Sequence, residues 1–446
     1  MPPRTSVRGH GALESSTMSS SQDARECFVY ITLPGETEPV TAARFEHAID
    51  RRSNRRGRLV YGRSYLERSN AVEIDPIELK LAAGTYETTE HEGLFGALRD
   101  AGPDHWGRRV IERHAGRPAL DELDYLLCSP DDRAGALGFG MGKEPPAPKR
   151  EFNQTLDLAR LQELADALIA DTGPDAGENG AAQVEDLLLL GTSMGGARPK
   201  AVVEDRDGLW LAKFNRPDVD RWNHARVEHA MLQLARECGL NVAESRVEPV
   251  GDRDALLVKR FDREKIDTGY LRGRMVSALT LLRADETRRV PERWSYILFA
   301  EELRRVSAAP REDAEELFRR MVFNALISNT DDHPRNHALL ARDVNWRLSP
   351  AYDLTPTAPV GVDRRDLAMI CGDAGRFANA ENLLSQASRF LLEREAAKAI
   401  VDQTEACVTN GWYRASRSAG VSEVDCERIS GAFGYPGFRY QPVDKP

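Results

Sequence analysis

Asp331, Asn336 and Asp353 are the residues whose types and spacing best fit a chemical task. A phosphoryl group in transfer carries negative charge on three oxygens, so an enzyme must hold Mg²⁺ against the phosphates and place a carboxylate beside the acceptor hydroxyl. In kinase-type sites the catalytic aspartate and a metal-binding asparagine lie five residues apart on one loop, and a second metal-binding aspartate follows. Asp331 and Asn336 have that spacing, and Asp353 follows a short strand-like run. The pattern predicts a phosphoryl-transfer centre.

Two other interpretations apply to the same segment. Asp, Pro and Asn are common turn residues, so residues 331–336 taken alone are equally typical of a polar turn. His333 and His337 are four residues apart, as in helical zinc sites. The glutamate of such a motif is missing and the sequence offers no third ligand, which disfavours zinc.

A glycine-rich segment upstream is typical of a phosphate-binding loop. Residues 191–201 include Gly195 and Gly196, which let backbone N–H groups approach phosphate oxygens because no Cβ intervenes. The residue order of a Walker A loop is absent. Glycine-rich turns are common, so this segment supports a nucleotide-binding site only in combination with other motifs.

Lys213 is the candidate for the lysine that contacts the α- and β-phosphates in a kinase. It lies among apolar residues in the strand-like segment 209–214, and an amphipathic helix is predicted over 223–239. Glu228 lies beside the apolar face of that helix and is the expected partner of Lys213. Solvated strand and helix faces are the ordinary alternatives for these two residues.

A buried-type strand at 255–258 leads to Lys259, Arg260 and Phe261. A strand that ends in this way is typical of a hinge, and backbone groups of these three residues could hold adenine.

The order of these segments resembles the HipA family, which comprises bacterial serine/threonine kinases that act as toxins of toxin–antitoxin pairs. The resemblance rests on Gly-Ala-Arg-Pro-Lys, Leu-Ala-Lys-Phe, Val-Lys-Arg-Phe-Asp-Arg, Asn-x-Asp-Asp-His-x-x-Asn and Tyr-Asp-Leu-Thr-Pro. It extends to Gly102–Arg109 and Asp132–Phe139, which are similar to the family's N-terminal subdomain, and covers about residues 28–440.

The resemblance implies a role for each matching residue. Asp331 would be the catalytic base, Asn336 and Asp353 the Mg²⁺ ligands, and Ser193 the site of autophosphorylation. A phosphate on Ser193 would repel the nucleotide phosphates and displace the glycine-rich loop. The implied ATP-binding residues are Gly195, Gly196, Ala197, Arg198, Pro199, Lys200, Lys213, Lys259, Arg260, Phe261, His333, Asn336, Tyr352 and Asp353.

The expected fold is α+β, a two-lobed protein-kinase-like fold with an added N-terminal α+β subdomain and a mostly helical C-terminal lobe. The expected divisions are a disordered tail at 1–26, the N-terminal subdomain at 27–150, the nucleotide-binding part at 151–262 and the helical catalytic lobe at 263–440. Met18 is an alternative start within the tail, which is rich in Ser, Arg, Gly and Pro.

The function expected from the resemblance is an ATP- and Mg²⁺-dependent protein serine/threonine kinase that acts as a toxin. Its implied partners are a protein substrate such as an aminoacyl-tRNA synthetase and a small helix-turn-helix antitoxin, with DNA bound only through that antitoxin. One alternative is a small-molecule or lipid kinase. Another is a non-catalytic nucleotide-binding co-repressor that acts through a DNA-binding partner.

The composition limits the direct partners. The formal net charge of −10 argues against unaided binding along DNA, which depends on Lys and Arg contacts with phosphates. The basic run Arg51–Arg58 is a local exception, typical of a solvated loop or of a contact with an acidic partner or nucleic acid. No apolar run of eighteen residues predicts a membrane span.

The cysteines indicate the compartment. Six are present without a Cys-x-x-Cys pair, so free thiols and a cytoplasmic location are expected. They are Cys27, Cys128, Cys238, Cys371, Cys407 and Cys426.

Overall fold

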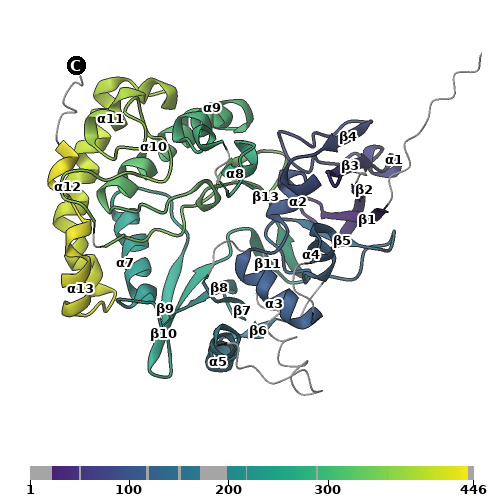
Figure 1. Cartoon of the computed structure of the whole chain (residues 1–446), viewed down its shortest axis with the longest axis horizontal. Helices are drawn as coiled ribbons and strands as arrows, with labels where there is room; N and C mark the ends of the chain where they lie inside the picture. The colour runs from purple at the N-terminus through teal and green to yellow at the C-terminus, as the bar shows by residue number, and fades with distance from the viewer. Residues whose placement is uncertain are drawn as a thin grey trace, which may run out of the picture.

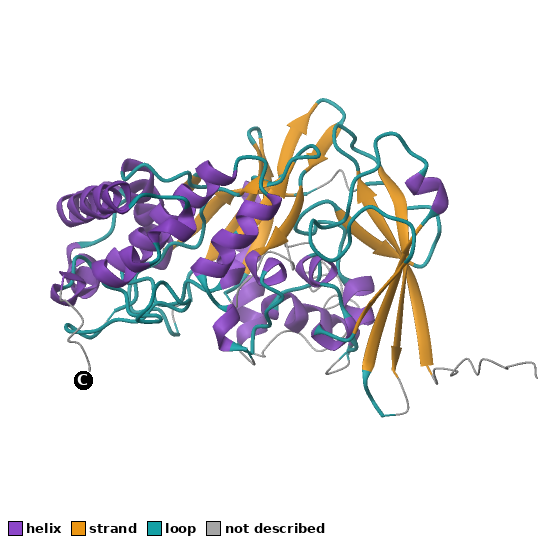
Figure 2. Ribbon diagram, turned by 90° about the horizontal axis from the view of Figure 1, so that it is seen from above, coloured by secondary structure: helices purple, strands orange, loops and turns teal. Residues whose placement is uncertain are grey.

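Two five-stranded sheets and a group of C-terminal helices are the main parts of the described residues, as Figure 1 shows from one side and Figure 2 from above. The N-terminal sheet lies at one end, the C-terminal helices lie at the other, and the second sheet lies between them. The computed structural model describes residues 23–49, 52–116, 120–148, 152–170, 198–216, 218–287, 290–358 and 360–439.

The N-terminal sheet is antiparallel and has the strand order β4-β3-β2-β1-β5. Along β1, which has a paired strand on each side, Cys27, Val29 and Ile31 are all buried, so this strand packs against the core. The strands are β1 (Asp23–Thr32), β2 (Pro39–Ile49), β3 (Arg55–Tyr61), β4 (Thr85–Thr88) and β5 (Leu137–Gly140).

The helices of the N-terminal part reach the second sheet. Helix α3 (His105–Ala115) begins at Asp104, whose carboxylate accepts a hydrogen bond from the Gly107 N–H, and ends at Gly116 in the left-handed conformation. Trp106 and Val110 of α3 belong to the same apolar cluster as the inner face of the second sheet. The other helices here are α1 (Arg63–Leu66), α2 (Gly96–Asp100) and α4 (Glu122–Cys128).

The second sheet has the order β6-β7-β8-β10-β9 and is antiparallel except for the β6–β7 pair. Helix α5 (Leu158–Ile169) shares an apolar cluster with α3 on one face, and α7 (His224–Glu237) contacts β10 through Ala225, Leu256 and Val258. The strands are β6 (Asn153–Gln154), β7 (Lys200–Asp205), β8 (Gly208–Phe214), β9 (Ser245–Val250) and β10 (Arg253–Lys259).

Two small sheets join the second sheet to the helical part. One pairs β11 (Arg263–Ile266) with β12 (Gly269–Arg272), and the other has the order β13-β14-β15. The strands of the latter are β13 (Arg274–Ser277), β14 (Ala338–Ala341) and β15 (Arg347–Leu348).

The C-terminal part is helical. Helix α10 (Pro310–Leu326) is its central element: Pro310 occupies the first helical turn, and Leu317, Phe318 and Met321 are fully buried. The other helices are α8 (Ala278–Leu281), α9 (Tyr296–Val306), α11 (Ala380–Ser385), α12 (Arg394–Ser418) and α13 (Glu423–Ile429). Short 3₁₀ turns in the chain are His91–Gly93, Thr155–Asp157, Pro291–Arg293, Pro334–Asn336, Ala387–Phe390, Ser430–Ala432 and Pro436–Arg439.

The α+β class and the helical C-terminal part agree with the sequence-based expectation. The helix predicted over 223–239 is present as α7, and Asn223 caps it by accepting a hydrogen bond from the Arg226 N–H. In the part of the chain that the structure describes, no helix has both the length and the apolar character required to traverse a lipid bilayer.

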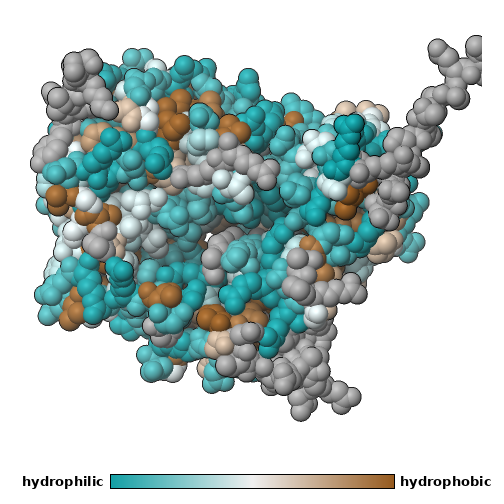
Figure 3. Space-filling view, in the orientation of Figure 1, coloured by the Kyte–Doolittle hydropathy of each residue, from teal (hydrophilic) through white to brown (hydrophobic). Residues whose placement is uncertain are grey.

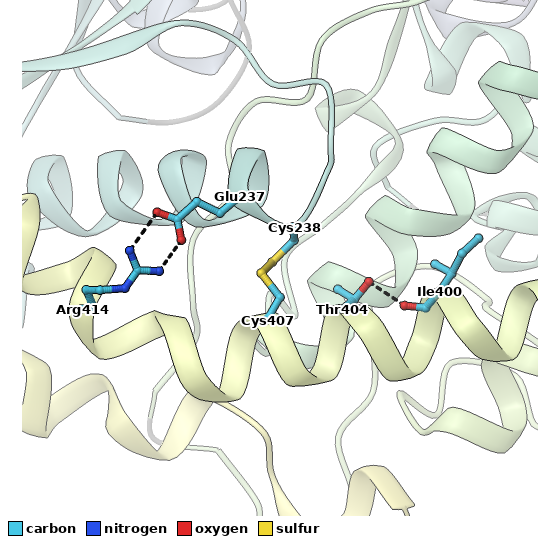
Figure 4. Close-up of a disulfide and its surroundings, with 6 residues drawn as sticks. All are labelled: Glu237, Cys238, Ile400, Thr404, Cys407 and Arg414. Atoms are coloured by element: carbon cyan, nitrogen blue, oxygen red, sulfur yellow. Dashed lines mark hydrogen bonds and ion pairs between the residues drawn. A yellow bond between two sulfur atoms is a disulfide. The ribbon is translucent and has the colours of Figure 1, made fainter.

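The expectation of six free thiols is wrong for two cysteines. Cys238, at the end of α7, and Cys407, within α12, form a disulfide with an S–S distance of 2.25 Å (Figure 4). The Glu237–Arg414 ion pair, at 2.7 Å, joins the same two helices. The cysteines are 169 residues apart, so no spacing motif marked them, and only the packing of α7 against α12 brings them together. Cys27, Cys128, Cys371 and Cys426 are free.

Loss of this disulfide is expected to destabilise the fold. A crosslink that closes a loop of 169 residues restricts the unfolded chain, and the chain-entropy model gives roughly 5 kcal/mol as the largest gain. Thermal unfolding without reductant should therefore show a lower midpoint for Cys407→Ser than for the wild type. The exposed thiol Cys128 supplies the control, because Cys128→Ser should leave the midpoint unchanged. Equal midpoints for all three proteins would contradict the crosslink.

Candidate active site

A cleft lies where the second sheet, the helical part and the N-terminal part meet, and residues from all three parts line it. Figure 3 shows a hollow near the middle of a mostly hydrophilic face. The lining residues are Asp100, Ala134, Leu211, Lys213, Val258, Lys259, Arg260, Phe261, Asp262, Met275, Ser277, His333, Arg335, Asn336, Tyr352 and Asp353.

The charged centre of the cleft is Lys213. Its Nζ lies 2.6 Å from Glu228 Oε1 and 2.6 Å from Asp353 Oδ1, so the ammonium bridges two carboxylates. Lys213 comes from β8, Glu228 from the second turn of α7, and Asp353 from the segment after β15, where it has a φ of 59°. The structure thus brings together three predicted residues from distant parts of the sequence.

These contacts fix the charges of the cluster. Burial disfavours ionised Asp353, but the Lys213 ammonium outweighs this effect and lowers the pKa of the carboxyl to about 2. Burial also opposes the charge on Lys213, and the carboxylates of Asp353 and Glu228 nevertheless raise its pKa. At neutral pH the cleft therefore holds an ionised carboxylate and a charged ammonium side by side.

The loop between α10 and β14 presents two neighbouring aspartates in opposite ways. Asp332 is buried, where its carboxylate accepts a hydrogen bond from the Tyr296 hydroxyl and lies 2.9 Å from His337 Nε2. Asp331 is exposed. Buried polar contacts of this kind fix a loop in one conformation, so Asp332 anchors the loop while Asp331 faces solvent.

The rest of this loop is tied to the Asp353 segment. Asn336 ends a 3₁₀ turn, and its side-chain amide donates to the Asp331 carbonyl at 3.3 Å. Thr330 Oγ1 donates to Thr357 Oγ1 at 2.8 Å. These bonds set the position of Asn336 relative to Asp353, and both side chains line the cleft.

The zinc alternative gains no support from the two histidines. His337 contacts Asp332 in the core, whereas His333 lines the cleft and packs edge-on against Trp294. The two rings take part in different contacts.

The predicted hinge residues Lys259, Arg260 and Phe261 all line the cleft. The N–H groups of Lys259 and Arg260 donate to the carbonyls of Glu244 and Leu209, at 2.8 and 2.9 Å. The Phe261 carbonyl accepts a hydrogen bond from Arg342 at 3.0 Å, and the Arg260 carbonyl accepts one from the Arg263 N–H at 3.3 Å. The Phe261 ring packs against Tyr352, with centroids 5.6 Å apart.

The residues predicted for the phosphate loop divide into two groups. Ser193, Gly195, Gly196 and Ala197 lie outside the described residues. Arg198, Pro199 and Lys200 are described but do not line the cleft.

Lys200 and Arg198 form ion pairs elsewhere. The Lys200 ammonium pairs with Asp104 at 2.8 Å, and both side chains are 2% exposed. Arg198 pairs with Asp220 at 2.8 Å. The charge on Lys200 still contributes to the lowered pKa of Asp353.

Sequence reasoning missed several residues of the cleft. Asp100 accepts hydrogen bonds from the Ser277 N–H and hydroxyl at 2.7 and 2.8 Å, and no sequence motif marked either residue. Ala134 lies within Asp132–Phe139, which carried part of the family resemblance without a role. The remaining residues missed are Leu211, Val258, Asp262, Met275 and Arg335.

Comparison with known proteins places the chain in a family. Residues 192–412 match the family model of the HipA-like C-terminal domain, and residues 47–140 match that of the HipA N-terminal domain. Together these models cover well over half of the chain. The chain belongs to the HipA family, as the sequence motifs predicted.

Individual relatives and one solved structure agree with this. "Putative kinase Y4mE" of Sinorhizobium fredii is 27% identical over 317 residues, which are 67% of this chain and 71% of that protein. A Haemophilus influenzae protein named "Putative kinase" is 26% identical over 144 residues, which are 30% of this chain and 41% of that protein.

The solved structure is that of the Shewanella oneidensis toxin–antitoxin system of HipA, HipB and operator DNA. It matches 91% of this chain and 94% of its own chain with a TM-score of 0.66 and 16% identity. The predicted two-lobed HipA-like fold is thereby confirmed.

Proposed function

We propose that this chain is an ATP- and Mg²⁺-dependent protein serine/threonine kinase that acts as the toxin of a toxin–antitoxin pair. One observation carries the proposal: the Lys213 ammonium lies 2.6 Å from both Glu228 and Asp353 in a cleft that Asn336 also lines. A lysine paired with a helix glutamate, next to a metal-binding aspartate and asparagine, is the arrangement that phosphoryl transfer from a nucleotide needs.

The residues present fit a magnesium nucleotide. Mg²⁺ prefers oxygen ligands, and Asp353 offers an ionised carboxylate while Asn336 offers an amide oxygen. When bound, the ion would neutralise charge on the phosphates. Lys213 would exchange part of its contact with Asp353 for the α- and β-phosphates while Glu228 keeps it oriented.

Asp331 would act on the acceptor. Its exposed carboxylate would accept the proton of a serine or threonine hydroxyl as the hydroxyl oxygen bonds to the γ-phosphorus and the bond to the leaving ADP oxygen breaks. The buried Asp332 beneath it would keep the loop in place.

Incubation with γ-labelled ATP and a cell lysate tests this function and its alternatives. Label on serine or threonine of a protein band, absent with Asp331→Asn, would support a protein kinase. Label in an extractable small molecule or lipid would instead indicate a small-molecule or lipid kinase. Nucleotide binding without any transfer would indicate a non-catalytic co-repressor.

The proposed partners follow from family membership. We propose a small helix-turn-helix antitoxin through which the chain reaches DNA, and an aminoacyl-tRNA synthetase as the type of protein substrate. Growth arrest on induced expression, relieved by Asp331→Asn and by co-expression of the antitoxin, is the expected result. Arrest that persists with Asp331→Asn would contradict a toxin that works by phosphoryl transfer.

Ser193 is the proposed site of autophosphorylation. After incubation with Mg-ATP, mass spectrometry of the peptide that contains residue 193 is expected to show one added phosphate, and the modified protein should bind ATP more weakly because the new charge repels the nucleotide phosphates. Ser193→Ala should bind ATP normally and remain active for longer. An unmodified peptide in an active preparation would exclude this form of self-inactivation.

A further inference from the structure

The N-terminal part contributes a loop to the wall of the nucleotide cleft. This loop, residues 132–135, is named here the Asp132 loop. Ala134 lines the cleft, and the loop backbone is bonded to the segment that follows β10: the Gly135 N–H donates to Asp262 Oδ2 at 2.9 Å, and Arg263 donates to the carbonyls of Arg133 and Gly135 at 2.6 and 2.8 Å.

A buried ion network holds the loop against the hinge. The Arg260 guanidinium donates to Asp132, to the Arg133 carbonyl at 2.8 Å and to Asp262 at 2.8 Å. The side chains of Arg260, Asp132 and Asp262 are 1%, 2% and 5% exposed. Buried charges persist only when they are paired, so Asp132 and Asp262 together hold the Arg260 guanidinium in place.

Strand register shows which part of the cleft the loop faces. Leu211 of β8 pairs with Val258 of β10, and Lys213 lies two residues further along β8 on the same face, at a distance of roughly 7 Å. The hinge continues from Val258 in the opposite direction, toward Asp262 and the Asp132 loop. The loop is thus at the hinge end of the cleft, and Lys213 lies toward the other end, where it pairs with Asp353.

We propose that the Asp132 loop is part of the nucleotide site, with Ala134 forming the wall against the base and Asp132 acting as a positioning residue that sets the hinge through Arg260. This inference rests on the proposed nucleotide-dependent function. Under this proposal, residues of both the N-terminal part and the kinase-like part form the binding site for the base.

Ala134→Leu tests the wall. A larger side chain there should weaken Mg-ATP binding about tenfold or more, because it fills space that the base needs. Binding of Mg-tripolyphosphate, which has no base, should stay within about twofold of the wild type. Ala83→Leu, at an exposed alanine of the same subdomain, is the matched control and should change neither affinity. Titration calorimetry measures all of these affinities.

Two neighbouring aspartates test the positioning role. Asp132→Asn weakens the charge contact with Arg260 and should reduce affinity for Mg-ATP more than for Mg-tripolyphosphate. Asp131→Asn is its control: that carboxylate binds Arg272 at 2.7 Å instead, so Mg-ATP affinity should remain near that of the wild type.

The outcomes separate this inference from the proposed function. Equal Mg-ATP affinities for the wild type and Ala134→Leu would show that Ala134 does not form a wall against the base. This conclusion would hold even if Asp132→Asn failed to fold. A variant that loses both ligands equally would also overturn it, since the loop would then act on the phosphates or on the fold. A wild type that binds Mg-tripolyphosphate but not Mg-ATP, or neither ligand, would instead overturn the proposed function.

Discussion

Asp331→Asn is expected to lower the rate of phosphoryl transfer by about 10²–10⁴-fold, the contribution of a positioned general base. The affinity for Mg-ATP should change little, because Asp331 is exposed and is not among the residues that line the cleft. Single-turnover transfer of label to protein measures the rate, and calorimetry with Mg-ATP measures the affinity. Activity equal to the wild type would remove Asp331 from the reaction.

Asp332→Asn is the matched variant one residue away. Its carboxylate is buried and bonded to Tyr296 and His337, so its loss should appear as a lower free energy of unfolding, by about 1–3 kcal/mol. Asp331→Asn should leave that free energy unchanged. If Asp332→Asn abolished transfer without lowering the free energy of unfolding, Asp332 would be the candidate base. Asp331 would then lose that role.

Asp353→Asn is expected to weaken Mg-nucleotide binding by at least about 10–100-fold, since even outer partners of metal ligands contribute that much. The change removes a carboxyl group whose pKa is lowered to about 2, so that it is ionised at neutral pH. Lys213 then pairs with Glu228 alone. Titration with ATP in the presence and absence of Mg²⁺ measures this effect. The affinity for ATP should depend strongly on Mg²⁺ in the wild type and almost not at all in the variant.

The control for this prediction is Asp343→Asn. Asp343 lies in the loop before β15, its carboxylate accepts a hydrogen bond from the Asn345 N–H, and it is not among the residues that line the cleft. It should bind Mg-ATP as the wild type does. A metal dependence that survives in Asp353→Asn would place the ion on other residues.

The charged centre was the most predictable part of this protein. Spacing within one loop selected Asp331 and Asn336, and helix periodicity placed Glu228 beside the face that packs on the sheet. The family resemblance supplied the two-lobed fold. These signals are local or follow the chain in order, so the sequence carries them directly.

The walls of the cleft were not predictable in the same way. Ala134 lines the cleft beside Gly135, whose N–H is bonded to Asp262 across a separation of 127 residues, and no local pattern encodes such a contact. The segment Lys259–Phe261, which the sequence predicted as a hinge, lines the cleft, but two of its N–H groups are bonded within the protein, which only the fold could reveal. The Cys238–Cys407 pair was missed for the same reason.

That disulfide limits how the molecule can move. Helix α7 carries Glu228 near its start and is bonded covalently to α12 at its end, so the helix cannot swing away from the C-terminal helices while the bond is intact. In an oxidised molecule, opening or closing around a nucleotide therefore has to come from displacement of the strands relative to a fixed α7. After reduction, the Glu237–Arg414 ion pair and the apolar packing between the two helices would be the contacts that still hold α7 against α12.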